Sequence, residues 1–203
     1  MIVTILTVVA TTWLVVSLRA DRGQIAKPIA SLGFLLVLSE PLEPGTRTVL
    51  IVIGLVLGAV GDVALMGRSD VAFLAGMASF LLGHVAYLVA FALDATDPIW
   101  VGIGSLVSLT LAVVVTRWLR PNLEAPFTVA IPVYVVVICL MLTAGIGAGP
   151  VRPPAAAGAA LFAASDLLVA RQRFVTSDRI NPTIGLPLYY AAQLLIAWSV
   201  VAG

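Results

Sequence analysis

The sequence has little charge, and this scarcity excludes an ordinary water-soluble fold. Asp, Glu, Lys and Arg make up 10% of its 203 residues, whereas 61% are hydrophobic. A soluble domain has about 25% charged residues. The formal net charge is only +1 and no basic stripe is present, so we expect no nucleic-acid partner.

Residues that commonly build metal sites and disulfides are also scarce. The chain contains one cysteine, Cys139, and one histidine, His84, so no internal disulfide and no Cys/His zinc spacing is available. The motifs Gly-x-Ser-x-Gly and His-Glu-x-x-His do not occur. We therefore expect neither a metal nor a cofactor.

Long apolar runs dominate the sequence, and a helix that crosses a membrane needs about 20 such residues. The pattern predicts an all-α, polytopic bundle of about eight transmembrane helices that forms a single transmembrane domain over residues 1–203. We interpret the first run as a retained span, because its charges follow the apolar stretch. The predicted spans are residues 2–18, 28–38, 47–66, 71–93, 99–116, 125–144, 154–170 and 183–201.

Basic residues gather in alternate loops, as they do on the cytoplasmic side of membrane proteins. Loops two, four and six hold only Arg47 and Arg152. The pattern predicts an inner-membrane protein with both termini outside the cytoplasm and a site that opens toward the cytoplasm. The odd-numbered loops hold Arg19, Arg22, Lys27, Arg68, Arg117, Arg120, Arg171, Arg173 and Arg179.

Two carboxylates, Asp62 and Asp166, lie inside predicted spans. An ionised carboxylate in the middle of a span costs about 2.5 to 3.5 kcal/mol, so such residues usually face a bundle interior and mark function. Gly54 and Gly58 precede Asp62 at intervals of four, and Gly158 lies two turns before Asp166, which predicts closely packed faces. We predict that the two carboxylates meet at one depth; the alternative is that each reaches interfacial water.

The two carboxylates also lie in similar segments. Gly61-Asp62-Val63-Ala64-Leu65 resembles Ser165-Asp166-Leu167-Leu168-Val169 at a separation of four spans. Two parallel four-helix repeats would produce this similarity. Chance similarity in an apolar sequence would produce it equally well.

Other polar residues in the spans have both functional and structural interpretations. His84 and Tyr87 share one helical face, and counting along the span places His84 nearly 20 Å from the cytoplasmic surface, deeper than Asp62. Gln193 and the neighbouring Tyr190 fit either a site or interhelical packing. Lys27 is either a snorkelling residue or a cation beside a carboxylate or a phosphate.

Four segments occur in series: GDVALM at 61–66, FLLGHVAY at 80–87, FAASDLLVA at 162–170 and YYAAQLL at 189–195. Together they resemble the YhhN family of lysoplasmalogenases. The resemblance implies an eight-helix membrane enzyme that hydrolyses the vinyl ether bond of lysoplasmalogen, with choline or ethanolamine head groups, to a fatty aldehyde and a glycerophospho-base. It implies Asp62 and Asp166 as the catalytic carboxylates.

The implied chemistry needs an acid to protonate carbon and a base to stabilise the cation. Two neighbouring carboxylates do not readily ionise together, so one is expected to hold a proton, and the sequence does not assign the roles. A lipid substrate and the bilayer are the expected partners. The alternative function is a small-molecule or proton-coupled transporter that uses the same carboxylates. The residues predicted to support the substrate are Lys27, His84, Tyr87, Ser165, Tyr190 and Gln193.

Overall fold

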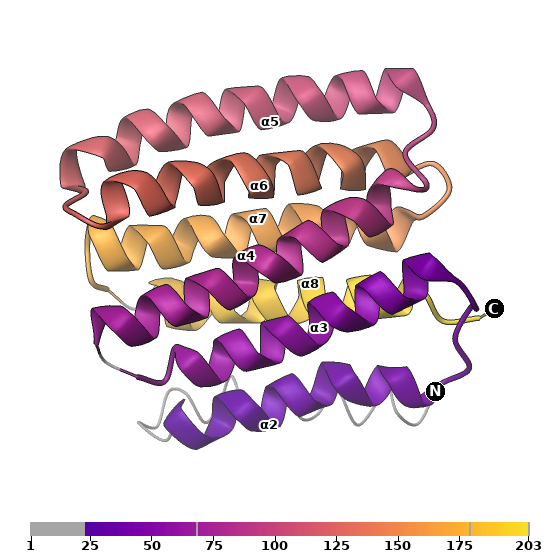
Figure 1. Ribbon diagram of the computed structural model, residues 1–203, viewed down its shortest axis with the longest axis horizontal. Coiled ribbons are helices and arrows are strands. Elements are labelled where there is room, and N and C mark those ends of the chain that lie inside the picture. The colour runs from indigo at the N-terminus through magenta and orange to yellow at the C-terminus, as the bar shows by residue number, and fades with distance from the viewer. Residues whose placement is uncertain (1–22, 68, 179, 203) are drawn as a thin grey trace.

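The computed structural model describes residues 23–67, 69–178 and 180–202, with side chains described from residue 30 onward. Within these ranges the fold is all-α, with seven α-helices joined by short loops (Figure 1). A π-helical turn, Asn181–Gly185, leads directly into α8. The helices are α2 (Gly23–Leu36), α3 (Thr46–Ala64), α4 (Asp70–Ala92), α5 (Pro98–Leu119), α6 (Phe127–Ala148), α7 (Pro153–Phe174) and α8 (Leu186–Trp198).

The prediction of eight full spans is wrong for the described chain. Five helices, α3 to α7, are long and apolar enough to cross a membrane, which makes this an integral membrane protein. The predicted span at residues 2–18 lies outside the described residues. The helices in the second and eighth predicted spans, α2 and α8, are only 14 and 13 residues long. Pro182 lies in the π-helical turn and Pro187 in the first turn of α8, where each lacks the backbone N–H donor that a longer regular α-helix would use.

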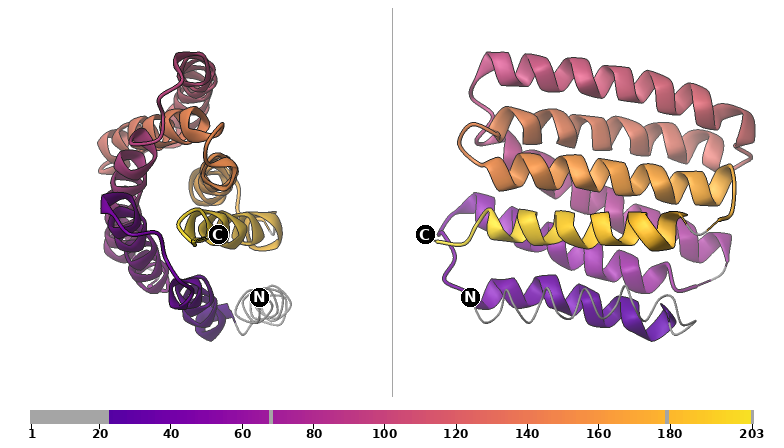
Figure 2. Two further views of the ribbon diagram at one scale, coloured as in Figure 1. Left: turned by 90° about the vertical axis from the view of Figure 1, so that its right-hand side faces the viewer. Right: turned by 180° about the vertical axis from the view of Figure 1, so that it is seen from behind.

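Successive helices run in opposite directions and pack mainly against their neighbours in sequence. The pairs α3–α4, α5–α6 and α7–α8 have the most extensive contacts. Seen end-on, α5, α6, α4, α3 and α2 follow a curve, and α7 and α8 lie on its concave side (Figure 2). Helices α3 and α4 cross α6 and α7 diagonally (Figure 1). The end of the bundle that carries Arg117, Arg120, Arg171 and Arg173 is called the basic end below.

Glycines allow the helices of this bundle to approach closely. A Cβ atom on Gly54 would overlap the Tyr87 ring, and one on Gly58 would overlap the Gln193 amide. A Cβ on Gly158 would lie 2.6 Å from Cγ1 of Ile196. The predicted close packing of these faces is therefore confirmed.

An ion-pair network closes the end of the bundle opposite the basic end. The Glu43 carboxylate accepts hydrogen bonds of 2.7 and 2.8 Å from Arg152 and one of 2.7 Å from Arg47. Arg47 also donates to the carbonyl of Ser199 at 2.8 Å, and its Nε lies 3.5 Å from Asp94. The network thus joins the segments before α3, after α4, before α7 and after α8.

Glu43 should make stability depend on acidic pH. Its hydrogen bonds from Arg152, and then those from Arg47, hold the pKa of this carboxylate below its ordinary value of 4.5. A lowered folded-state pKa gives stability that is present above the unfolded pKa and is lost as pH falls through the folded value. We expect Glu43→Gln to lower the unfolding free energy by about 1 kcal/mol at neutral pH and by less near pH 4.

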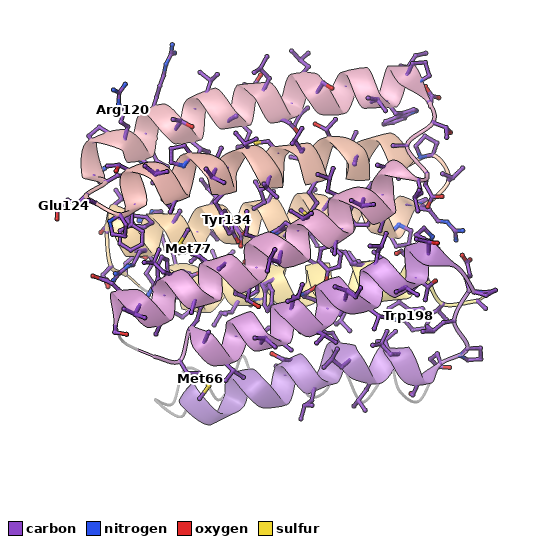
Figure 3. The ribbon with its side chains drawn as sticks, in the orientation of Figure 1. Met66, Met77, Arg120, Glu124, Tyr134 and Trp198 are labelled. Carbon is purple, nitrogen blue, oxygen red and sulfur yellow. The ribbon has the colours of Figure 1, made fainter. Side chains whose placement is uncertain are left out.

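Thermal unfolding in detergent at both pH values tests this expectation. Glu124→Gln is the matched control, because Glu124 is exposed and points away from the bundle (Figure 3). Equal destabilisation by Glu43→Gln at the two pH values would show that charge pairing does not stabilise this end.

Candidate functional site

Asp62 lies in the last turn of α3 and is only 4% exposed. Its Oδ2 atom accepts a 2.6 Å hydrogen bond from the Ser31 hydroxyl of α2 and a 2.8 Å bond from the Tyr189 hydroxyl of α8. Charge-assisted hydrogen bonds of this kind offset the cost of removing a carboxylate from water. Three helices therefore contribute to the surroundings of this carboxylate.

A hydrogen-bonded chain extends from Asp62 across the bundle to α4. The Tyr189 oxygen accepts a 3.1 Å bond from Nε2 of Gln193, and Oε1 of Gln193 accepts a 2.6 Å bond from the Tyr87 hydroxyl. An amide nitrogen only donates and an amide oxygen only accepts, so Gln193 sets the direction of the chain. Each hydroxyl proton consequently points along the chain toward Asp62.

Asp166, on α7, has a different set of neighbours. Its Oδ2 accepts a 2.9 Å hydrogen bond from the Tyr134 hydroxyl of α6, and the Nε2 atom of His84 lies 3.5 Å away. The His84 ring is held edge-on against Phe162, with ring centroids 4.5 Å apart. The Asp166 side chain is 18% exposed, against 4% for Asp62.

The predicted depth of His84 is wrong. The residue lies beside Asp166 instead of deeper in the bundle. Helix α4 crosses α7 diagonally, so distance along α4 exceeds depth in the bundle (Figure 1). In addition, Cα–Cβ bonds tilt toward the start of a helix. Because α4 and α7 run in opposite directions, His84 leans toward the basic end while Asp166 leans away from it, and the two side chains meet.

Both carboxylates line one cavity of about 410 Å³. The cavity walls are mostly apolar, and toward the basic end the lining comes from the last turn of α7 and the segment that follows it. The two carboxylates thus border the same cavity, and each has its own hydrogen-bond donors. Apolar lining residues include Phe80, Leu111, Val115, Val135, Ile138 and Cys139.

The predicted supporting residues occupy different positions around the cavity. Tyr87 and Gln193 belong to the hydrogen-bonded chain. Ser165 lines the cavity and donates to the carbonyl of Gly185 at 3.0 Å, which holds the π-helical turn against α7. Tyr190 is buried with its ring 4.9 Å from that of Tyr189. Lys27 belongs to α2, but its side chain lies outside the described part of the structure.

Three residues that hydrogen-bond the carboxylates were not among the predicted site residues: Ser31, Tyr134 and Tyr189. Tyr134 had a detectable signal, because it is the only tyrosine of the apolar helix α6 and lies well inside the span, away from the interface where tyrosine is usual. Figure 3 shows it among the helices. Ser31 carried no comparable signal, since serine is common in closely packed membrane helices.

The described side chains contain no group of three or more His, Cys, Asp and Glu residues that could hold a metal ion. The residues that the cavity brings together are two carboxylates with hydroxyl, amide and imidazole neighbours. Such a set can donate, accept and hold protons within an apolar cavity.

Comparison with known proteins identifies the family. A family model described as the YhhN family matches residues 23–200. The chain belongs to the YhhN family. Both carboxylates, with the donors Ser31, Tyr134 and Tyr189, lie within the matched residues.

The chain is also similar to several mammalian proteins. The bovine protein named lysoplasmalogenase TMEM86A is 35% identical over 159 residues, which cover 74% of this chain and 65% of the relative. The rat lysoplasmalogenase TMEM86B is 34% identical over 155 residues, covering 76% and 63%, and the human TMEM86B is 33% identical over 172 residues, covering 82% and 69%. The chain thus spans slightly less than two thirds of the first two relatives. No solved structure matches it.

The close approach of α3 to Gln193 can be tested by adding one methyl group. In Gly58→Ala the new Cβ would overlap the Gln193 amide, so we expect a loss of about 1 to 3 kcal/mol from overpacking. In Gly102→Ala the Cβ meets open space, and stability should stay the same or rise by up to about 1 kcal/mol through helix propensity. Thermal unfolding in detergent measures both, and equal unfolding temperatures would contradict the observed packing.

Proposed function

We propose that this protein is a membrane-embedded hydrolase that cleaves the vinyl ether bond of lysoplasmalogen. The observation that carries the proposal is the pair of carboxylates, Asp62 and Asp166, on one mostly apolar cavity. Such a cavity suits a lipid chain, and the carboxylates supply acid–base groups at its wall. The similar mammalian proteins add support, because each is named a lysoplasmalogenase.

Vinyl ether hydrolysis requires a proton on carbon before water can attack. An acid protonates the alkenyl carbon that is beta to oxygen, and the electron pair of the double bond forms the new C–H bond. The resulting oxocarbenium ion takes up water, which loses a proton to a base and gives a hemiacetal. The hemiacetal breaks its C–O bond to the glycerol, yielding a fatty aldehyde and a glycerol hydroxyl. The sum is the addition of one water molecule.

The hydrogen bonds favour Asp62 as the ionised partner. Gln193 orients the Tyr189 hydroxyl so that it donates to Asp62, and Ser31 donates to the same oxygen. Donors directed at one carboxylate oxygen stabilise its negative charge. Asp62 would therefore stabilise the oxocarbenium ion and receive the proton of the attacking water.

Asp166 would then be the acid. Its greater exposure places it at the cavity surface, where a bound alkenyl group can reach its carboxyl proton. Tyr134 donates a hydrogen bond to its Oδ2 atom, and Nε2 of His84 lies 3.5 Å from the same oxygen. These two contacts would orient the carboxyl group and make His84 and Tyr134 positioning residues.

Replacing either carboxylate by its amide should abolish turnover and leave the fold intact. We expect Asp62→Asn and Asp166→Asn each to reduce aldehyde release from lysoplasmalogen by at least about 100-fold, as for loss of a general acid or base. Purified protein in detergent and an assay for released aldehyde provide the measurement. Glu124→Gln, which removes an exposed carboxylate at the basic end, should retain full activity.

This assay also separates hydrolysis from transport. Turnover in detergent needs no closed compartment, whereas a transporter has measurable activity only across a membrane. Full activity of either Asp variant would disprove the carboxylate mechanism, and the absence of aldehyde from the folded wild type would disprove the hydrolase assignment.

Removing the Tyr134 hydroxyl should have a smaller effect than removing a carboxylate. Tyr134→Phe loses one hydrogen bond to Asp166, worth about 1 to 2 kcal/mol, so we expect kcat to fall roughly tenfold. Thr128→Ala removes a hydroxyl from the exposed side of the same helix and should leave kcat unchanged. Equal rates for Tyr134→Phe and the wild type would show that Tyr134 does not position the acid.

A further inference from the structure

We infer that the ion pair of Arg173 and Asp70, at the mouth of the cavity, binds the zwitterionic phospho-amine head group of the lipid. The inference rests on the proposed hydrolase function and adds a binding site to it. In this arrangement Arg173 holds the phosphate and Asp70 holds the ammonium group.

Arg173 has the right position on α7. It follows Asp166 by seven residues, which is two helical turns, so the two side chains share one face about 10 Å apart along the axis. Both residues line the cavity, as does Ala170 between them. A lipid with its vinyl ether at Asp166 would place its phosphate, one glycerol unit away, near Arg173.

Aromatic rings hold the Arg173 guanidinium in place. Its central carbon lies 4.8 Å from the centroid of Phe73 and 5.7 Å from that of Phe127. These two rings pack edge-to-face with Phe174, at centroid distances of 5.1 to 6.1 Å. A guanidinium over aromatic faces is stabilised by cation–π attraction and keeps its N–H groups pointing outward in its plane.

The guanidinium has donors available for a phosphate. Among the described residues, Asp70 is the one hydrogen-bond acceptor of Arg173 and takes a single donor, Nη2. A guanidinium carries five N–H donors in a planar fork that matches two phosphate oxygens. Arg173 can therefore retain Asp70 and bind a phosphate from the cavity side.

Asp70 makes the site suited to a zwitterion. Its side chain is 67% exposed and that of Arg173 is 36% exposed, so both reach the water at the basic end. An exposed ion pair adds little to stability, so a ligand can share it at small cost. A phospho-amine head group carries a negative phosphate, which complements Arg173, and a positive ammonium, which complements Asp70.

The neighbouring arginine is less suited to this role. Arg171 makes a two-pronged ion pair with Asp178, at 2.9 and 2.6 Å, and does not line the cavity. Within the described residues, Arg173 is the one basic side chain on the cavity wall. Gln172, Ser177 and Asn181 add uncharged polar groups to the same mouth.

Head-group selectivity tests the inference. The substrates are lysoplasmalogens with ethanolamine, choline or phosphoglycerol head groups. We expect Arg173→Gln to raise KM for all three roughly tenfold with little change in kcat, since each carries a phosphate. Asp70→Asn should raise KM for the two zwitterionic lipids and not for the anionic phosphoglycerol lipid. Arg120→Gln and Glu124→Gln, exposed and pointing away from the bundle at the same end, should change no KM (Figure 3).

A charge-exchange variant separates binding from a purely structural tether between α4 and α7. If the pair only joined the helices, Asp70→Arg combined with Arg173→Asp would restore wild-type KM values and thermal stability. The head-group site predicts that the exchange leaves KM raised. Restored KM values, or an Asp70→Asn variant that affects all three head groups alike, would overturn the inference while leaving the hydrolase function intact.

Direct binding keeps the inference testable if the wild type releases no aldehyde and the hydrolase function fails. Titration calorimetry in detergent would then compare glycerophosphoethanolamine with inorganic phosphate. Saturable binding of glycerophosphoethanolamine that is lost in both single variants supports the site. Binding that is unchanged in Asp70→Asn, or seen equally with inorganic phosphate, overturns it.

Discussion

A carboxylate among apolar helices is stable only where the protein replaces the water that it has lost, and this requirement governs the packing around Asp62. Its donors come from α2 and α8, and the chain behind Tyr189 continues to Tyr87 on α4. One face of α3 makes room for this chain. Gly58 lies against Gln193 and Gly54 lies against Tyr87, one and two turns before the carboxylate. The Gly-x-x-x-Gly-x-x-x-Asp spacing therefore accommodates the buried hydrogen bonds as well as the close helix contact.

The surroundings of Asp166 differ from those of Asp62. Asp166 has one hydroxyl donor and an imidazole neighbour, and it borders the cavity more openly than Asp62 does. Two carboxyl groups can act as acid and base in one reaction only if their surroundings differ. The asymmetry arises because α3 packs against the polar face of α8, whereas α7 presents Asp166 to α4 and α6.

Local sequence patterns predicted the features that depend on one helix at a time. Apolar length identified α3 to α7 as spans, and spacing identified Gly54, Gly58 and Gly158 as close-packing positions. The cost of burying charge pointed to Asp62 and Asp166, which indeed share a cavity. Features that depend on the angle between helices were not accessible: residue counting gives distance along an axis, so it misplaced His84 on the diagonal helix α4.

The cavity is confined to the half of the bundle nearest the basic end. On α6 its lining runs from Ile131 to Cys139 and leaves out the second half of the helix, and on α5 it begins only at Leu111. Under the proposed function, a cavity in one half of the bundle would take its lipids from a single leaflet. Lipids of the opposite leaflet would have to flip across the bilayer before they could react. The two products would also separate, because the aldehyde would stay dissolved in the hydrocarbon and the glycerophospho-base would diffuse into the adjoining water. Hydrolysis would in this way deplete one leaflet of single-chain lipid and alter the area balance between the two faces of the membrane.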